Sequence, residues 1–411
     1  MTAKLAVGYL HVGRPQHGVS RYGRLLAAEA RSRPELLVRE AELLLDGHGK
    51  ENRRRLLRAA GDLAGADLVH LQYNTQLVSS VWGPGWSQLA NLWTFVRRVR
   101  APLAVSVHDL FPPASLREIG QLTRTKIALL ARRRLAKVVR SPVAAEEVPS
   151  FGLRSKLRRN FRPEAVTLRW LARGGRQLIV CSQEERERLN EFLPDAAVTV
   201  IPHFVESRAL PTRPDDAKRA LGLGDSRVVT LLGYIHPRKG HVLLVDAMPY
   251  LPADVVVVFA GGAAPEQTAY LTELLNAARA TGTAERLRVT GYLPESELEQ
   301  YLAATDLAVC PFTDASASGS LSTWISVQKP VLASDLPLIS EYNSIEPGAI
   351  VTFQPYTAAA FSAAICRLLN TGQVEMNAAI GRLREKLSIS RMLARHVSTY
   401  ELLLASDGTG R

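Results

Sequence analysis

The sequence predicts an α/β protein with two doubly wound domains, each built around a parallel sheet. Short apolar runs rich in β-branched residues alternate along the chain with longer segments whose apolar residues recur every three to four positions. The alternation occurs in two successive series, as expected for parallel strands joined by helices. With 411 residues, 46% of them hydrophobic, the chain is long enough for two separate cores.

The first series predicts a domain over residues 1–207. Each predicted strand is a short apolar run bounded by polar or turn residues, which is typical of buried parallel strands. These strands are predicted at residues 4–10, 66–73, 102–109, 177–182 and 197–202. Helical periodicity is clearest at residues 22–30 and 185–193.

The second series predicts a domain over residues 208–384. Proline, glycine and charged residues cluster at 207–225, which we interpret as the join between the domains. The strands of this domain are predicted at residues 228–234, 254–261, 286–292, 306–312 and 330–334. Residues 385–411 are predicted to form a C-terminal helix that packs back on the first domain.

Cysteine content and apolar run lengths exclude several classes of protein. Cys181, Cys310 and Cys366 are far apart and show no CxxC spacing, which argues against a disulfide framework or a cysteine metal site. The N-terminal apolar run is shorter than that of a signal peptide. No window of about 18 uninterrupted apolar residues predicts a membrane-spanning helix. We therefore expect a cytoplasmic protein.

The net charge of +12 is concentrated in one segment. Residues 121–176 contain fifteen Lys and Arg and three acids, so they carry the entire excess. Such a block indicates one surface for an anionic partner, either a membrane or nucleic acid, while an ordinary solvated helical face explains it equally well. No nucleic-acid recognition motif accompanies the charge, so nucleic acid is the least expected partner.

Residues 77–100 form a second segment that bears on the membrane hypothesis. It combines aromatic residues with arginines, a mixture suited to a lipid headgroup interface. The alternative is that the aromatic side chains pack in the core of the first domain. On the membrane hypothesis the protein would lie peripherally on the inner face of the cell membrane. The residues are Trp82, Trp86, Trp93, Phe95, Arg97, Arg98 and Arg100.

Ligands of doubly wound sheets bind beyond the carboxyl ends of the strands, so residues that follow each strand are the candidates. After the first strand, Gly13 and Gly18 allow close backbone approach, and Ser20 could cap a helix whose free N–H groups attract an anion. The loop lacks the GxGxxG spacing of dinucleotide sites, and a plain strand–helix turn is the alternative. His108, at the end of the third predicted strand, could act as a donor or acid/base group or be structural, as could His70.

The clearest phosphate site follows the first strand of the second domain. Gly233 ends that strand, and Arg238 and Lys239 lie just before an apolar helical pattern. Two cations beside a helix N-terminus would offset negative charge on a leaving group. The GxxxxGK[ST] spacing of a Walker A loop is missing, and a lysine that caps a surface loop is the alternative.

A small-residue loop after the strand at 306–312 leads into another helix. Glycine there permits close approach, and the free N–H groups of the first helical turn can bind a diphosphate, with simple N-capping as the alternative. The residues at this helix start are Gly319, Ser320, Leu321 and Ser322.

Tyr292 and Leu293 follow a further strand of the second domain. The exposed backbone at this point could form hydrogen bonds with the edge of a planar base. The alternative is a capping box, with Ser296 as N-cap and Glu299 three residues on.

Together these segments resemble the retaining glycosyltransferases of the GT-B fold, in the large group called family four or glycosyl transferases group 1. The resemblance covers essentially the whole chain. It implies two Rossmann-like domains facing a cleft, the first binding the acceptor and the second a nucleotide diphospho-sugar. The matching segments are residues 17–24, 107–110, 200–206, 233–240, 289–298 and 306–341.

The resemblance also implies roles for individual residues. Lys239, helped by Arg238, would neutralise the leaving diphosphate, and His108 would contact the transferred sugar. Gly18 would offer its backbone N–H to the phosphates. The turn at residues 319–321 matches the phosphate-binding helix start of the family.

Two positions depart from the family pattern. The family has two glutamates eight positions apart around that helix start, one near the donor sugar and one on the ribose, and here these positions hold Ala315 and Thr323. Asp314 and Thr323 are the candidate substitutes, since a neighbouring carboxylate and a hydroxyl can still form hydrogen bonds with a sugar. A Gly-Ser-Leu variant of this segment occurs among bacterial members.

The resemblance implies a hexosyltransferase that moves a sugar from a nucleotide diphosphate donor to a glycan or lipid-linked acceptor in bacterial-type polysaccharide or glycoconjugate synthesis. No DxD pair stands at a strand end, so we expect neither a metal nor another cofactor. The alternatives are a nucleotide-sugar epimerase, a phosphorylase, or an inactive module that binds sugar nucleotides or a partner protein. The two missing glutamates favour the inactive module.

Overall fold

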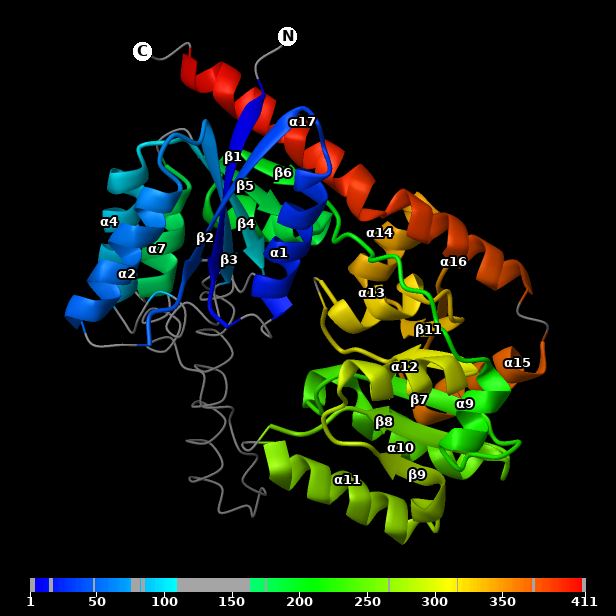
Figure 1. Ribbon diagram of the computed structural model, residues 1–411. Helices are drawn as coiled ribbons and strands as arrows, with labels where there is room; N and C mark the ends of the chain where they lie inside the picture. Colours follow the sequence, from blue (N-terminus) through cyan, green and yellow to red (C-terminus); the bar gives the residue numbers. More distant parts are fainter. Residues whose placement is uncertain are drawn as a thin grey trace, which may run out of the picture. The chain divides into compact units, whose positions relative to one another are not determined.

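The computed structural model contains two compact units, shown with the sequence colouring in Figure 1. Unit 1 comprises Met1–Cys181, Glu185–Ile201 and Arg395–Arg411, and unit 2 comprises Ser182–Glu184 and Pro202–Ala394. The structure describes residues 4–14, 18–46, 49–74, 82, 86–108, 163–173, 176–264, 267–315, 317–371 and 374–408.

Unit 1 is built on a parallel six-stranded sheet with the order β2-β1-β3-β4-β5-β6. Successive strands are added toward one edge of the sheet up to β2 and toward the other edge from β3 on. The switch point of this doubly wound fold therefore lies between β1 and β3. The strands are β1 (Leu5–Val12), β2 (Leu36–Leu43), β3 (Leu68–Asn74), β4 (Leu103–His108), β5 (Gln177–Val180) and β6 (Val198–Val200).

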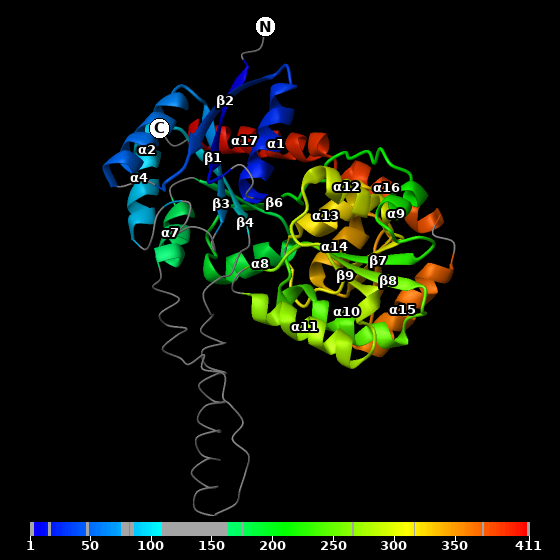
Figure 2. The same ribbon diagram turned by 60° about the horizontal axis from the view of Figure 1, so that its bottom comes forward.

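Two layers of helices cover this sheet (Figures 1 and 2). Helices α2 (Gly49–Asp62), α4 (Ser87–Val99), α7 (Pro163–Leu171) and α8 (Gln183–Phe192) pack an aliphatic core against one face. Helix α1 (Gly18–Arg31) and the end of α17 (Ile389–Gly408) lie on the other face.

The core beneath α17 contains polar side chains, and His70 is hydrogen-bonded among them. Its Nδ1 lies 2.7 Å from the Tyr400 hydroxyl and its Nε2 lies 2.8 Å from the Ser106 hydroxyl, and the side chain is fully buried. Burial holds the pKa of His70 well below its usual value. His70 is therefore a structural histidine, the second of the two interpretations given for it above.

Unit 2 is built on a second parallel six-stranded sheet, with the order β12-β11-β10-β7-β8-β9. When β7 is counted as strand 1, the order is 3-2-1-4-5-6, which is that of dinucleotide-binding folds. The switch point of this sheet lies between β7 and β10. The strands are β7 (Arg227–Leu232), β8 (Val255–Ala260), β9 (Leu287–Val289), β10 (Leu307–Cys310), β11 (Val331–Ser334) and β12 (Val351–Phe353).

The helices of unit 2 also form two layers, each with its own apolar core. Helices α10 (His241–Ala247), α11 (Thr268–Ala280) and α15 (Ala358–Asn370) cover one face. The other face is covered by α9 (Pro214–Ala220), α12 (Glu295–Ala304), α13 (Gly319–Ser326), α14 (Pro337–Ile345) and α16 (Val374–Lys386). The prediction of two doubly wound α/β domains is confirmed.

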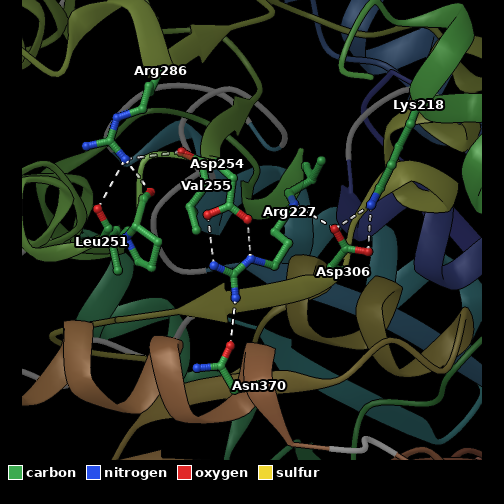
Figure 3. A network of polar contacts seen from close by, with 10 residues as sticks. Lys218, Arg227, Leu251, Asp254, Val255, Arg286, Asp306 and Asn370 are labelled. Atoms are coloured by element: carbon green, nitrogen blue, oxygen red, sulfur yellow. Dashed lines mark hydrogen bonds and ion pairs between the residues drawn. The ribbon is translucent and has the colours of Figure 1, made fainter. Parts of the chain in front are cut away.

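Charged residues join the amino ends of the unit 2 strands (Figure 3). Asp306, just before β10, accepts hydrogen bonds from Lys218 at 2.7 and 2.9 Å and from the Val228 N–H at 2.7 Å. Arg227 donates to both carboxylate oxygens of Asp254, at 2.7 and 2.9 Å. This edge of the sheet is thus held together by ion pairs.

Replacing Asp306 by alanine is expected to lower the free energy of unfolding by about 2–3 kcal/mol, because it leaves a largely buried ammonium and a backbone N–H without acceptors. Replacing Asp254 by alanine is the matched control and should cost clearly less stability, since that carboxylate is half exposed. Urea unfolding curves measure both. Equal losses of unfolding free energy in the two variants would show that the burial of Lys218 does not increase the cost of removing its partner.

Candidate functional site

The candidate site lies at the switch point of unit 2, beyond the carboxyl ends of β7 and β10. Two segments meet there, residues 233–240 after β7 and residues 311–319 after β10. The Thr313 N–H donates to the Arg238 carbonyl at 3.0 Å, which ties the two segments together. Ligands of open α/β sheets bind at this position because the flanking loops diverge there.

Two glycines make the close approach of these loops possible. Gly240 has φ +75°, and a Cβ at this position would lie 1.8 Å from the Pro311 carbonyl oxygen. A Cβ on Gly261 would lie 2.1 Å from the Gly233 carbonyl oxygen. Tyr356 completes the arrangement, since its hydroxyl donates to the same Pro311 carbonyl at 2.8 Å. Any other residue at 240 or 261 would push the loops apart.

Lys239 is the central cation of the site. Its Nζ donates to the Ser320 hydroxyl at 2.7 Å and lies 4.9 Å from the centre of the Phe312 ring. The side chain is half buried, and it forms no ion pair with any residue that the structure describes. Burial, with a smaller contribution from Arg238, lowers the pKa of Lys239 to about 8. The site therefore holds a partly desolvated positive charge that has no ion-pair partner in the described part of the chain.

The start of helix α13 supplies hydrogen-bond donors beside this charge. Ser318 is the N-cap, and its hydroxyl accepts from the Leu321 N–H at 3.3 Å. The N–H groups of Gly319 and Ser320 have no acceptor inside the helix, as at every helix start. Gly319 is exposed, with open space where a Cβ would stand. An ammonium and two adjacent N–H groups form an arrangement suited to a phosphate or diphosphate.

Arg238 and Asp314 lie at the rim of the site. Their charged groups are 4.0 Å apart, and both side chains are more than a third exposed. The Arg238 N–H donates to His236 Nδ1 at 3.2 Å. Burial together with the two adjacent cations lowers the pKa of His236, so this ring is a neutral acceptor near pH 7.

The other predicted residues of unit 2 divide into backbone and side-chain candidates. Leu321 is fully buried, so only its backbone is available to a ligand, while Leu293 is partly buried and packs against the same core. Tyr292 is 75% exposed beyond β9. The Thr323 hydroxyl donates to the Gly319 carbonyl at 2.8 Å, and the Ser322 hydroxyl lies 3.4 Å from His203 Nδ1.

The predicted residues of unit 1 lie at the carboxyl edge of its own sheet. His108 ends β4, is buried, and has Nε2 2.7 Å from the Gln72 side-chain oxygen, with its ring edge-on to Tyr22. Gly18 is the exposed first residue of α1. Ser20 lies inside the first turn of this helix and is not a cap. Most of the basic block, including residues 121–162, lies outside the described residues.

Sequence reasoning did not single out Ser318 or Gly261, and it included Gly240 in the loop after the first strand of the second domain without giving it a role. Ser318 was passed over, although a serine three residues before the apolar Leu321 is a recognisable N-cap signal. Gly240 and Gly261 each follow a strand end, but their requirement for glycine depends on contacts with Pro311 and Gly233 that no local pattern reveals. The capping box proposed at Ser296 is wrong, because α12 begins at Glu295 with Pro294 as its N-cap.

Of the aromatic side chains in the predicted membrane segment of unit 1, some lie in the core and others on the surface. Trp82 and Phe95 are fully buried and pack edge-to-face. Trp86 and Trp93 are 59% and 46% exposed, and the Arg97 guanidinium lies 4.6 Å above the Trp93 ring. Within the described ranges, no helix is long and apolar enough to cross a membrane, and no cluster of three metal-ligating side chains is found.

Known structures define the class of fold. The Anabaena protein HepE, crystallised in complex with UDP and glucose, is 16% identical to this chain, with a TM-score of 0.64 over 97% of this chain and 99% of that one. WaaG, a glycosyltransferase involved in lipopolysaccharide biosynthesis, is 12% identical, with a TM-score of 0.58 over 95% of this chain and 98% of that one. The two parallel six-stranded sheets therefore have the GT-B fold.

Sequence comparison narrows the class further. Residues 226–371 match the family described as Glycosyl transferases group 1. A GDP-mannose-dependent alpha-(1-6)-phosphatidylinositol monomannoside mannosyltransferase from Mycolicibacterium smegmatis is 32% identical over 127 residues, which are 29% of this chain. The matched part spans about a third of that relative, 32% of its length.

Proposed function

We propose that the protein is a retaining hexosyltransferase that moves a sugar from a nucleotide diphosphate donor to a lipid-linked or glycan acceptor. The observation that carries this proposal is Lys239, a cation at the start of α13 and at the switch point of unit 2 that forms no ion pair with the residues described by the structure. The family match over residues 226–371, which include this site, supports it. So does the GDP-mannose dependence of the mycobacterial relative.

Leaving-group stabilisation is the proposed mechanism. The bond between the sugar C1 and the diphosphate oxygen breaks, and the acceptor oxygen forms a bond to C1 on the same face. The acceptor proton passes to the departing phosphate oxygen. Lys239, the N–H groups of Gly319 and Ser320, and Arg238 stabilise the negative charge that develops on the diphosphate. Since these groups supply the charge themselves, no metal is needed in this scheme.

The remaining roles follow the domain organisation. Residues 208–384 would bind the donor, with Gly233 beside its phosphates and the backbone at Tyr292 and Leu293 near its base. Asp314 and Thr323 would form hydrogen bonds with the donor sugar and the ribose in place of the missing glutamates. Residues 1–207 would bind the acceptor, with His108 facing the transferred sugar and Gly18 adding an N–H to the phosphates.

Binding and turnover together test this proposal. Calorimetric titration with UDP- and GDP-sugars identifies the donor, and release of the free nucleoside diphosphate measures slow hydrolysis when no acceptor is present. We expect one nucleotide sugar to bind and to be hydrolysed. Because Ala315 and Thr323 replace two carboxylates, the second candidate is an inactive sugar-nucleotide-binding module. Binding without any turnover would establish that candidate instead.

Donor affinity should depend on pH through Lys239. The ammonium is charged below its pKa of about 8 and loses its proton above it. The dissociation constant of the nucleotide sugar is therefore expected to be constant near pH 6.5–7 and to rise up to about tenfold per pH unit above 8. A Lys239→Arg variant stays charged and should remove this rise. The same rise in that variant would assign the titration to another group.

The outer surface of α2 and α4 supports a peripheral membrane location. These helices pack side by side, and Trp86, Trp93 and Leu57 are exposed on them. Arginines on the same two helices are also exposed, namely Arg53, Arg54, Arg58, Arg97 and Arg98. Indole rings beside arginines suit the headgroup region of an anionic bilayer, where a lipid-linked acceptor would be found.

Vesicle sedimentation measures this interaction. A double variant with Trp86→Ser and Trp93→Ser is expected to bind phosphatidylglycerol vesicles about tenfold or more weakly. The control is Leu402→Ser, which removes a 71% exposed leucine from α17. Binding that is insensitive to salt, or equally weakened by Leu402→Ser, would contradict a role for this surface.

A further inference from the structure

A second concave site lies in unit 1, at the amino-terminal edge of its sheet. This cavity of about 560 Å³ is formed by the end of α7, the segment that enters β5, the turn before β6 and the last turns of α17. Figure 1 shows α17 running to the edge at which β1 begins. His108 and Gly18 lie at the opposite, carboxyl edge of this sheet. The cavity is therefore separate from the acceptor region proposed above.

The polar lining of the cavity is strongly basic. Arg169, Arg173 and Arg176 contribute to its wall, against a single carboxylate from Asp195. The side chain of Arg173 is exposed and makes no hydrogen bond or ion pair with any residue that the structure describes. The Arg173 guanidinium therefore lines the cavity without an acceptor among the described residues.

Arg176 is held rigidly in this wall. Its Nη1 donates to the carbonyl oxygens of Trp170 at 2.6 Å and Arg173 at 2.8 Å, and its guanidinium lies 4.2 Å from the centre of the Trp170 ring. Partial burial lowers its pKa but leaves it charged at neutral pH. The two carbonyls engage one nitrogen only, so the rest of the planar guanidinium keeps donors for a ligand.

The remaining lining is apolar, with Leu193 and Leu403 among the contributing side chains. The volume falls within the range of sites for small organic ligands. Guanidinium groups bind phosphate through paired hydrogen bonds, while an apolar wall favours an attached organic group over inorganic phosphate alone. We propose that this cavity binds a phosphorylated organic ligand and that the three arginines recognise its phosphate group.

Protection of Arg173 from chemical modification tests this proposal at the site itself. The full-length protein is treated with phenylglyoxal, which modifies guanidinium groups, and the modification of each arginine is followed by peptide mass spectrometry. Glycerol phosphate at about 10 mM should slow the modification of Arg173 roughly tenfold, as for a ligand of millimolar affinity. Arg219, a 74% exposed arginine on α9 in unit 2, is the control and should react at an unchanged rate.

The source of the phosphate is distinguished by a second arm with vesicles. Protection by soluble glycerol phosphate assigns the cavity to a soluble organic phosphate. Protection by phosphatidylglycerol vesicles, but not by glycerol phosphate or by phosphatidylcholine vesicles, assigns it to a lipid headgroup. Either result supports the proposal. An unchanged rate at Arg173 with every probe, or equal protection of Arg219, overturns it.

An arginine variant provides an independent check. Arg169→Gln removes one of the three guanidinium groups and should abolish most of the protection of Arg173. Circular dichroism shows whether α7 remains folded in this variant. A folded Arg169→Gln protein in which glycerol phosphate still protects Arg173 tenfold would also overturn the proposal. Hydrolysis of the nucleotide sugar is measured separately, so failure of this proposal would leave the proposed function standing.

Discussion

Replacing Lys239 by alanine is expected to lower the turnover number about 10²–10³-fold, the usual cost of removing one group that stabilises transition-state charge. The ammonium lies 2.7 Å from the Ser320 hydroxyl and beside the free N–H groups at the start of α13. It would therefore contact the diphosphate as negative charge develops there. Steady-state rates with the nucleotide sugar identified by calorimetry measure the loss.

Two controls separate this effect from a loss of folding. Lys239 forms no ion pair with any described residue, so the alanine variant should be at least as stable as the parent protein in thermal unfolding. Arg219→Ala removes an exposed cation of the same unit and should leave the rate unchanged. A Lys239→Ala enzyme with undiminished turnover would refute the assignment of this lysine to the leaving group.

Replacing Gly240 by alanine is expected to lower the free energy of unfolding by about 3 kcal/mol or more and to abolish donor binding. The new Cβ would stand 1.8 Å from the Pro311 carbonyl oxygen, in a backbone conformation with φ +75°. Overpacking and a left-handed backbone each contribute about 1–3 kcal/mol. Because Pro311 and Lys239 belong to the two segments that form the site, relief of the clash would move the phosphate-binding groups apart.

Gly348→Ala is the matched control for this variant. Gly348 has φ +76°, but the space around its missing Cβ is open. Its replacement should cost only the conformational part, about 1–2 kcal/mol, and leave donor affinity unchanged. Urea unfolding and calorimetric titration of both variants give the comparison. Equal losses of stability in the two variants would show that contact with Pro311 is unimportant.

Most strands that surround the site could be predicted from the sequence, because buried parallel strands are short continuous apolar runs. The two strands that were not predicted, β2 and β12, each lie at one edge of their sheet, whereas the strands at the opposite edges, β6 and β9, were predicted. Strand β2 carries Arg39, Glu40 and Glu42, which are partly exposed, and β12 has only three residues. The charged side chains interrupt the apolar run of β2, as is common in edge strands.

The candidate site could be predicted in part. The glycine after β7, the adjacent lysine and the small residues before α13 are visible as local patterns. The contact between Lys239 and Ser320 joins residues 81 positions apart, so no local pattern reveals it. Likewise, Trp82 and Trp86 lie four positions apart in the same stretch of sequence, so the local pattern does not show which of them is buried. The burial of Trp82 and the exposure of Trp86 depend on how α4 packs.

Because Lys239 has no ion-pair partner among the described residues, its charge destabilises the protein when no ligand is bound. A partly desolvated ammonium raises the free energy of the folded state, as the lowered pKa of Lys239 reflects. A bound diphosphate would supply the absent negative charge and stabilise unit 2 by mass action in addition. The ligand-free protein would then be the less stable form, and its stability in the cell would increase with the concentration of the nucleotide sugar.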